Sequence, residues 1–393
     1  MAGAILVINA GSSSLKYALY RIEGGDVVQA QSGLLDNLQG TPHFAAKSAG
    51  GEVLATRDWA HGELAAHDGA IEFLLEFVAG EAGEAGELAG VGHRVVHGGT
   101  RYLDPVRVTP AIIDDLERLV PLAPLHQPHN LAPMRIFARR APALPQVACF
   151  DTAFHRTASP LAQTFALPRE MTDAGIRRYG FHGLSYEFIA GRLREIDAVA
   201  ARGRVVVAHL GNGASMCAMV DGASVATTMG LTALDGLVMG TRTGSIDPGV
   251  LLYLQRERGM DEPALDDLLY RRSGLLGVSG ISSDMRTLLA SDDAHARFAI
   301  ELFCYRAVRE IGSLAAAMQG IDALVFTAGI GERAAPVRER VVASLAWLGF
   351  ACAIDANARD ALLISTADSK PVYVIATDEE RMIAAHTRGI IEA

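Results

Sequence analysis

The segment from Asn9 to Lys16 contains the side chains best suited to bind a phosphate. It reads Asn-Ala-Gly-Ser-Ser-Ser-Leu-Lys, a turn with several hydroxyl groups, closely spaced backbone N–H groups and a lysine at its exit. Such a turn can surround an anion with hydrogen-bond donors while the lysine supplies a positive charge. A serine-rich hairpin without a ligand explains the same residues about equally well. The segment alone therefore leaves both interpretations open.

Two more turns of this general kind follow later in the chain. Residues 211–215 read Gly-Asn-Gly-Ala-Ser after an apolar run, which repeats the first pattern and weakens its interpretation as an ordinary hairpin. Residues 328–332 read Ala-Gly-Ile-Gly-Glu between an expected strand and a helix expected to begin near Pro336. A strand–GxG–helix junction is weak evidence for a nucleotide when it stands alone.

Arg94, Asp151 and Arg242 are the charged residues that most suggest catalysis. Arg94 ends an expected strand, and Arg242 lies in a glycine-rich loop over 227–248 that is too long for a simple turn. Loops of that length in a compact domain are usually functional. Asp151 directly follows an expected buried strand at 147–150, where open α/β sheets hold ligands. A solvated arginine and a helix N-cap are the structural alternatives.

The elements that must position these residues occur in two similar sets. An apolar strand at 4–8, a Gly-Ser turn and a second strand at 15–20 open the chain, and the same order recurs at 205–220. Two copies about two hundred residues apart predict a duplicated domain, with one donor-rich hairpin from each half facing a shared cleft. This is the pattern of actin-like and sugar-kinase-like ATPases.

Periodic apolar residues predict the helices. We expect helices over 68–79, 109–120, 131–141, 185–193, 265–271 and 293–318. The proline-containing segment 121–130 is expected to be a rigid loop. The buried stripe of the longest helix is expected to consist of Phe298, Leu302, Tyr305 and Ile311.

Two residues are expected to cap helices. Ser185 is a candidate cap for the helix over 185–193, and Thr377 is expected to pair with Glu380 in a capping box for the terminal helix. The capping box gives Glu380 a structural role. It leaves Glu379 unexplained.

Composition narrows the class of protein. A chain of 393 residues, 50% of them hydrophobic and 20% charged, fits two globular domains, and no apolar run is long enough to span a bilayer. The N-terminus has no basic residues ahead of its apolar run, so no secretory signal is expected. A net charge of −10 argues against nucleic acid or an anionic membrane as the main partner. The cysteines at 149, 217, 304 and 352 are scattered and are expected to be reduced and buried in a cytoplasmic protein.

Ten segments in order resemble the acetate kinase family over nearly the whole chain. They read NAGSSSLKY, HRVVHGG, PLAPLH, FDTAFH, RRYGFHG, HLGNGAS, MGTRTG, SGISSDMR, FTAGIGE and ATDEE. The resemblance implies an α/β fold of duplicated actin-like (ribonuclease H-like) domains with βββαβαβα topology and an active-site cleft between them. It implies an N-terminal domain of residues 1–150 plus the helix 378–393, and a C-terminal nucleotide-binding domain of residues 151–377.

The resemblance also implies an activity, namely reversible transfer of the γ-phosphoryl group of ATP to acetate, which gives acetyl phosphate and ADP. Mg²⁺ or Mn²⁺ is the implied cofactor, a homodimer the implied assembly, and short carboxylates and ATP the implied partners. A propionate (short-chain acyl) kinase is the first alternative. A sugar kinase would use an aspartate base with few arginines, and an actin-like or chaperone ATPase would not need Arg94, Asp151, His182 and Arg242 together.

Site residues follow by matched position in the family segments. The implied catalytic residues are Arg94, His126, Asp151, His182 and Arg242. The implied substrate-binding residues are Arg94, Val96, Leu125, Phe181 and Ala233. The implied nucleotide-binding residues are Ser12, Ser14, Lys16, His209, Leu210, Gly211, Asn212, Gly213, Asp284, Met285, Arg286, Gly329, Ile330, Gly331 and Arg333. The implied metal-binding residues are Asn9 and Glu379.

Two positions depart from the family pattern. Arg333 stands where acetate kinases usually have the asparagine of GIGEN, next to the nucleotide. Ala233 stands where they have the proline of GLTPLEG, which lines the pocket for the acyl methyl group. Loss of the proline ring predicts a roomier acyl pocket.

Overall fold

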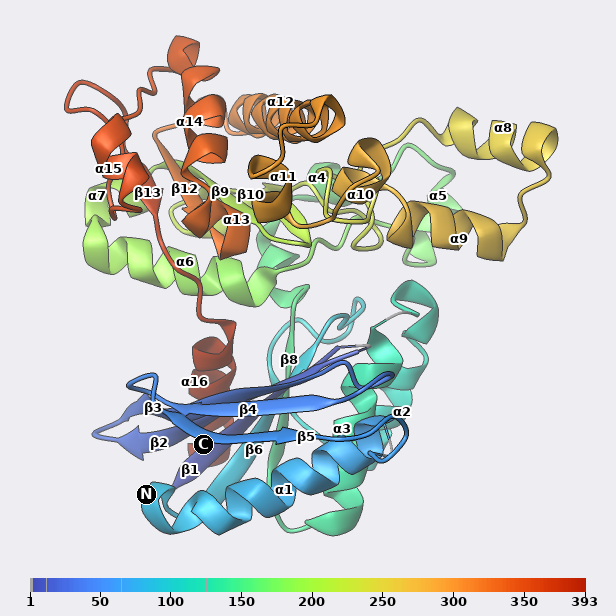
Figure 1. Cartoon of the computed structure of the whole chain (residues 1–393), viewed down its shortest axis with the longest axis vertical. Helices are drawn as coiled ribbons and strands as arrows, with labels where there is room; N and C mark the ends of the chain where they lie inside the picture. Colours follow the sequence, from blue (N-terminus) through green and yellow to red (C-terminus); the bar gives the residue numbers. More distant parts are fainter. Residues whose placement is uncertain (1–2, 12, 65, 125) are drawn as a thin grey trace. The chain divides into compact units, whose positions relative to one another are not determined.

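The computed structural model describes residues 3–11, 13–64, 66–124 and 126–393 (Figure 1). Ser12 and Leu125, two of the expected site residues, lie outside the described residues. The chain forms two compact units, one of Met1–Ala153 with Asp378–Ala393 and the other of Phe154–Thr377. We call them unit 1 and unit 2. The cleft expected between the two halves stays a prediction.

Unit 1 is built on a mixed sheet with the strand order β5-β4-β3-β2-β1-β6-β8-β7. The strands are β1 (Ala4–Ala10), β2 (Leu15–Glu23), β3 (Asp26–Asp36), β4 (His43–Ser48), β5 (Val53–Asp58), β6 (Leu88–Val95), β7 (Val106–Arg107) and β8 (Gln146–Phe150). Strands β1 to β5 form an antiparallel meander, while β6 pairs parallel with β1 and β8 parallel with β6. The expected first hairpin is therefore present, with its polar turn between β1 and β2.

Helices cover both faces of this sheet (Figure 1). They are α1 (Ala66–Ala85), α2 (Pro110–Glu117), α3 (Gln127–Arg140) and α16 (Glu379–Glu392). Val91 of β6 packs in the core with α1 and α3, whereas a Cβ at Gly92 would lie 2.6 Å from Cγ2 of Ile383 in α16. Successive strand residues point to opposite faces, so the glycine lets α16 approach the second face closely. Arg94, two residues after Gly92, points to that same face.

Two helix starts in unit 1 differ from expectation. Helix α3 begins at Gln127 rather than 131, because Pro128 occupies the first turn, where a missing N–H does no harm. The cap of α16 is Asp378, whose side chain accepts a hydrogen bond from Arg381 N at 2.9 Å. The expected Thr377–Glu380 capping box is therefore wrong. Thr377 instead donates its backbone N–H to the carboxylate of Glu332.

Unit 2 repeats the strand order of unit 1 at its centre. Its sheet has the order β11-β10-β9-β12-β13, formed by β9 (Arg204–Leu210), β10 (Ala214–Val220), β11 (Ala223–Thr227), β12 (Ala323–Thr327) and β13 (Val372–Val374). Strands β9 to β11 are an antiparallel meander, and β12 and β13 continue in parallel. The series β3-β2-β1-β6-β8 has the same order and directions. The duplicated actin-like fold is thus confirmed.

The helices of unit 2 either pack on this sheet or extend to one side of it (Figure 1). They are α4 (Pro160–Gln163), α5 (Arg169–Asp173), α6 (Gly183–Ile196), α7 (Ala198–Arg202), α8 (Pro248–Arg258), α9 (Glu262–Arg271), α10 (Gly274–Ser279), α11 (Met285–Leu289), α12 (Ala294–Ala317), α13 (Ala328–Arg333), α14 (Ala335–Ala343) and α15 (Ile354–Ala358). Helix α6 begins at Gly183, and Ser185 is buried inside it rather than capping it.

The buried face of α12 is not the one expected. Phe298 and Tyr305 are each 60% exposed, so the stripe predicted through them is wrong. The helix packs instead through a face rich in small side chains, which comprises Ala296, Ala299, Ile300, Phe303, Cys304, Ala307, Ile311, Leu314 and Ala315. Apolar residues recur at helical spacing on both faces, and sequence periodicity alone does not distinguish them.

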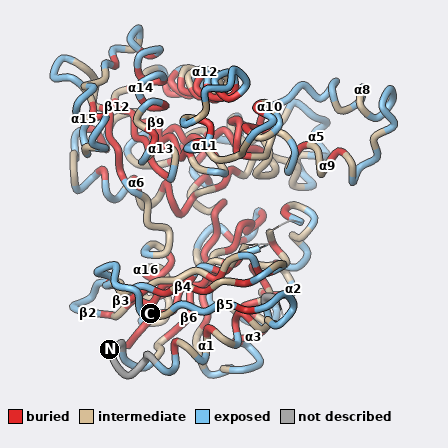
Figure 2. The backbone as a smooth tube through the Cα atoms, viewed as in Figure 1, coloured by how far each residue is buried: buried red, intermediate tan, exposed pale blue. Residues whose placement is uncertain are grey.

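Burial is concentrated in the two sheets (Figure 2). Cys149, Cys217 and Cys304 are buried and Cys352 is partly buried, and all four are free thiols. Across the described part of the chain, no helix combines the length and the apolar character needed to cross a membrane.

Candidate active site

Arg94 and Asp151 form a bidentate ion pair at the carboxyl ends of two neighbouring strands of unit 1. Arg94 Nη2 lies 2.5 Å from Asp151 Oδ2, and Arg94 Nε lies 3.2 Å from Asp151 Oδ1. Asp151 is almost completely buried, directly after β8. Parallel strands end at one edge, so β6 and β8 bring the two side chains together as expected for an open α/β sheet.

Asn9 and Glu379 complete this cluster. Arg94 Nη1 donates to Asn9 Oδ1 at 3.3 Å, and Arg94 Nε lies 3.8 Å from Glu379 Oε2. Asn9 comes from β1, while Glu379 is the first residue of α16. The packing of α16 on the glycine face of β6 is what carries Glu379 to Arg94. The cluster therefore joins residues from the beginning, middle and end of the chain.

Burial dominates the electrostatics of the cluster. It raises the pKa of Asp151, and it raises the pKa of Glu379 to about 7 because Asp151 and Glu380 add repulsion that Arg94 only partly offsets. Burial alone would lower the pKa of Arg94, but the two carboxylates outweigh it and raise that pKa above its usual value. A buried carboxylate that holds its proton near neutral pH is a group that a further cation would ionise.

The cluster could bind a hard divalent cation whose remaining ligands are waters and substrate phosphates. Within the described ranges, no three His, Cys, Asp or Glu side chains are close enough to hold a metal by themselves. Mg²⁺ keeps several waters and takes one or two protein carboxylates besides substrate phosphates. The carboxylate of Glu379 and the side-chain oxygen of Asn9 match that requirement.

Other expected residues of unit 1 lie near the first turn and β6. Asn9 and Lys16 are cross-strand partners at the two ends of the turn between β1 and β2. Within this turn, Gly11 N donates to Ser14 O at 2.8 Å. Lys16 is exposed. Val96 is buried just after β6, and His126 is the N-cap of α3.

Asn130 is a structural member of this region that we did not expect. Its side chain accepts from Val96 N at 2.9 Å and donates to Ala10 O at 2.7 Å, and it is buried. It thereby ties the end of β6 to the turn that follows β1. The only signal in the sequence is an asparagine among prolines and histidines, which does not reveal a partner.

In unit 2, His182 and His209 form a stacked pair. Their ring centroids are 4.1 Å apart and their planes are 16° from parallel. His182 is the N-cap of α6 with φ +58°, a left-handed conformation that costs a non-glycine residue energy and is held only by its surroundings. His155 Nε2 lies 3.0 Å from the carbonyl of Phe181, the residue before His182.

Arg242 approaches the glycine turn from the long loop. A Cβ at Gly213 would lie 3.5 Å from His182 Nε2 and 3.8 Å from Arg242 Nη1, so both groups converge above this glycine. Arg242 Nη1 also donates to Ala233 O at 2.9 Å. The departure from the family pattern at 233 therefore lies beside one of the expected catalytic arginines.

Eight of the expected nucleotide residues line one cavity of about 570 Å³ in unit 2. Its lining includes Gly211, Asn212, Asp284, Met285, Arg286, Gly329, Ile330 and Arg333, all expected, and Ser283, Leu289 and Ala334, which were not. Gly331 and Gly213 lie outside this lining. A mixed polar and apolar cavity of that size suits a nucleoside.

Two parts of the cavity lining have structural roles of their own. Asp284 caps α11 and forms a close ion pair with Arg286, whose guanidinium lowers the pKa of Asp284 to about 2. The GxG segment is helix α13 rather than an open loop, entered through Ala328 at φ +63°. Gly331 O accepts from Arg338 Nη1 at 2.9 Å, so a buried arginine anchors this segment.

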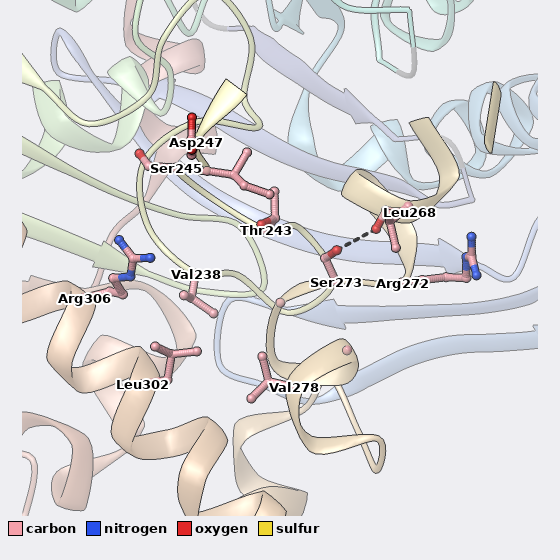
Figure 3. A pocket seen from close by; sticks show the side chains of 13 residues that line it. Val238, Thr243, Ser245, Asp247, Leu268, Arg272, Ser273, Val278, Leu302 and Arg306 are labelled. Atoms are coloured by element: carbon pink, nitrogen blue, oxygen red, sulfur yellow. Dashed lines mark hydrogen bonds between the residues drawn. The ribbon is translucent and has the colours of Figure 1, made fainter. Parts of the chain in front are cut away.

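A larger cavity of about 680 Å³ lies elsewhere in unit 2 and contains none of the expected residues (Figure 3). Val238, Leu302 and Val278 form part of its wall, with Arg306, Ser245 and Asp247 around it. Size alone does not identify the active site here. The convergence of charged side chains in the smaller sites is the better guide.

Comparison with known proteins identifies the family of this chain. The profile of the Acetokinase family matches residues 4–385. An acetate kinase of Rhodopseudomonas palustris is 55% identical, covering 98% of each chain, and one of Rhizobium meliloti is 50% identical, covering 99% of each.

Solved structures give the same result. A propionate kinase of Francisella tularensis has a TM-score of 0.92 at 37% identity, with 99% of this chain and 100% of that chain covered. The acetate kinase of Porphyromonas gingivalis has a TM-score of 0.87 at 36% identity, with the same coverage. This chain belongs to the acetokinase family, whose kinases phosphorylate a carboxylate with ATP and a divalent metal.

Proposed function

We propose that the protein is an acetate kinase, which transfers the γ-phosphoryl group of ATP to acetate and gives acetyl phosphate and ADP, reversibly and with Mg²⁺. The observation that carries this proposal is the pair of charged clusters, Arg94 with Asp151 and Glu379 in unit 1, and Arg242 with His182 above Gly213 in unit 2. Acetate kinases at up to 55% identity over nearly the whole chain support it.

Phosphoryl transfer needs charge neutralisation and positioning more than covalent chemistry from the protein. We assign Arg94 and Arg242 to the carboxylate and the transferring phosphoryl group, because a guanidinium stays charged and offers a planar fork of donors. Asp151 fixes the fork of Arg94 through two hydrogen bonds and so orients it. His182 and His126 are assigned as donors to phosphoryl oxygens.

Nucleotide and metal are assigned to the remaining groups. The cavity beside Gly211, Met285 and Ile330 would take the adenosine, and the turns carrying Ser14, Lys16 and Asn212 would take its phosphates. Asn9 and Glu379 would hold Mg²⁺, which when bound neutralises phosphate charge. Ionisation of Glu379 would then follow from the charge of the metal.

Propionate is the alternative acceptor that a specific observation favours. Ala233, which stands in place of the family's proline, lies beside Arg242, and one relative of closely similar structure is a propionate kinase. We propose that Phe181, which is buried, contributes to the acyl pocket with Ala233.

A homodimer is the assembly we propose, with a second copy covering the apolar face around the larger cavity. Helix α8 has no buried residue (Figure 2). It exposes Leu252 and Tyr253, and α12 exposes Phe298 and Tyr305. Exposed apolar side chains that form one contiguous patch mark protein interfaces, and we propose that these residues belong to such a patch. Light scattering should give twice the chain mass at micromolar concentration, and a monomer would exclude the dimer.

A cytoplasmic location is proposed because ATP is the donor and the four cysteines are free thiols.

Trapping of acyl phosphate as the hydroxamate tests the function directly. Acetate, propionate and butyrate are each supplied with ATP and Mg²⁺, and ATP turnover is measured with and without acid. We expect acyl hydroxamate with acetate and little turnover without acid. ATP hydrolysis that is independent of any acid would identify an actin-like or chaperone-type ATPase instead.

A further inference from the structure

Two chains of hydrogen bonds run from the stacked histidines into the interior of unit 2. His182 Nδ1 lies 2.8 Å from Ser215 Oγ, and Ser215 Oγ lies 2.5 Å from the phenol oxygen of Tyr186. His209 Nδ1 lies 2.9 Å from Ser185 Oγ, and Ser185 Oγ lies 2.8 Å from Thr377 Oγ1.

Both chains of hydrogen bonds connect helix α6 with the hairpin of β9 and β10. Ser215 of β10 is the cross-strand partner of His209 in β9, yet its hydroxyl bonds to His182 at the start of α6. Ser185 lies in the first turn of α6, yet its hydroxyl bonds to His209. Each serine therefore holds the histidine of the other element. The backbone start of α6 and the glycine turn are locked together at these bonds.

The chemistry of the groups gives the direction of the first chain. A phenol is more acidic than an aliphatic hydroxyl and is the better donor, so Tyr186 donates to Ser215. Within the described residues, Ser215 Oγ bonds only to Tyr186 and His182, so we infer that its own proton is directed to Nδ1 of His182, which must be unprotonated to accept it. The proton of a neutral imidazole consequently resides on Nε2. Ser215 and Tyr186 are both fully buried, so no bulk water competes for these bonds.

The Nε2 side of the ring faces the glycine turn. His182 Nε2 is the atom nearest the position that a Cβ of Gly213 would occupy, and Arg242 Nη1 approaches the same position. The stacked ring of His209 covers one face of the imidazole and fixes its plane. A second positive charge here would lie close to Arg242, which also favours the neutral ring.

We propose that Ser215, supported by Tyr186, is a positioning residue that holds His182 neutral with its proton on Nε2, so that Nε2–H is presented as a donor above Gly213. The proposal rests on the proposed function, because the acceptor of that hydrogen bond is a phosphoryl oxygen of the reacting complex. It gives a role to Ser215, the serine of HLGNGAS, and to Tyr186, neither of which was an expected site residue.

Steady-state kinetics of three variants tests the role. Ser215→Ala removes the donor to Nδ1, and we expect kcat to fall by about 10- to 100-fold, the range for groups that orient a reactive imidazole. KM for ATP and for acetate should change by about twofold or less, because the bond acts in the transition state. Tyr186→Phe leaves the serine in place and should cause a smaller fall in kcat.

Ser224→Ala is the matched control. Ser224 Oγ lies 2.9 Å from Nδ1 of His155, which is also a buried serine–histidine bond in unit 2, but the other nitrogen of His155 already lies against Phe181 O. We expect this variant to lose thermal stability comparably while its kcat stays within about threefold of wild type. An equal loss of kcat in Ser224→Ala and Ser215→Ala would overturn the proposal.

¹⁵N-histidine NMR of the whole protein gives a readout that does not depend on activity. The signal of His182 is identified by its absence in His182→Gln, and protonated and unprotonated ring nitrogens have well separated shifts. We expect Nε2 protonated and Nδ1 unprotonated in wild type, with this preference lost in Ser215→Ala. A protonated Nδ1 in wild type would overturn the proposal. If wild type makes no acyl phosphate, the proposed function fails, while the NMR result still decides the tautomer.

Discussion

The imidazole rings of His182 and His209 lie face to face with their centroids 4.1 Å apart. Two unit charges at about 4 Å repel by about 4 kcal/mol at the effective dielectric constant of a protein surface. A second positive charge on the pair is therefore disfavoured. Arg242, which approaches the same glycine turn, supplies a charge that does not titrate.

Arg242→Lys should lower kcat by about 100-fold or more. Nη1 of the guanidinium donates to Ala233 O and also approaches the point above Gly213, and an ammonium lacks the planar fork that could bind a phosphoryl or carboxylate group in a bidentate way. Arg271→Lys, at an exposed residue of α9, is the control and should keep wild-type kcat. Near-full activity in Arg242→Lys would show that the assigned role is wrong.

Glu379→Gln should raise the Mg²⁺ concentration needed for half-maximal activity, because the buried carboxylate next to Arg94 is the protein charge best placed for the metal. Activity is titrated with Mg²⁺ at saturating ATP and acetate. Glu380→Gln removes a carboxylate one residue further along α16 and should leave the titration nearly unchanged. An unaltered metal dependence in Glu379→Gln would reduce this residue to a favourable charge at a helix N-terminus.

Propionate should be used with a kcat/KM within about tenfold of that for acetate, because one methylene is worth about 1–3 kcal/mol in a hydrophobic pocket. Ala233→Pro should move the ratio toward acetate by refilling the wall with ring carbons. The alternative is that the loop closes over the space that alanine leaves. A propionate-to-acetate ratio that does not change in Ala233→Pro would show that Ala233 does not set the pocket.

Arg338→Met should destabilise unit 2 by about 3–5 kcal/mol, since it leaves the partners of a fully buried charge unpaired. Arg338 donates to Asn357 and Gly331 O and pairs with Asp360 at 2.5 Å. Loss of the bond to Gly331 should also raise KM for ATP. Arg340→Met, on the exposed side of α14, is the control. Thermal unfolding measures the first effect, and wild-type stability in Arg338→Met would refute it.

Stability should fall on mild acidification because of buried histidines. Burial lowers the pKa of His93 to about 4, against an ordinary value near 6.5. Between these values the unfolded chain binds a proton that the folded chain does not, so the stabilisation present above pH 6.5 is lost as pH falls toward 4. Each such histidine contributes about 1.4 kcal/mol per pH unit.

His93→Leu isolates this contribution. The free energy of unfolding is measured in urea without Mg²⁺ from pH 7.5 to 5, for wild type and variant. The pH dependence of the variant should be shallower by about 1.4 kcal/mol per pH unit. Parallel curves would show that His93 does not titrate in this range. His97 and His155, whose pKa values burial also lowers to about 4, remain in both proteins.

Much of the site was predictable because it depends on short segments. A strand, a turn of small polar residues and a second strand need only neighbouring residues to form, so Asn9 and Lys16 at one turn and Gly211 and Asn212 at the other were found from the sequence. The order of the family segments then identified Arg94, Asp151 and Arg242. Local chemistry and order along the chain thus determined the fold class and the main candidates.

Only the tertiary structure decided which distant groups meet. Glu379 reaches Arg94 because α16 packs on the glycine face of β6, and Ser215 bonds to His182 because α6 begins beside the second hairpin. The apolar face of α12 is exposed because its alanines pack more closely on the core. Hydrogen bonds between residues far apart in sequence depend on how elements pack, and no periodicity of a single segment encodes that packing.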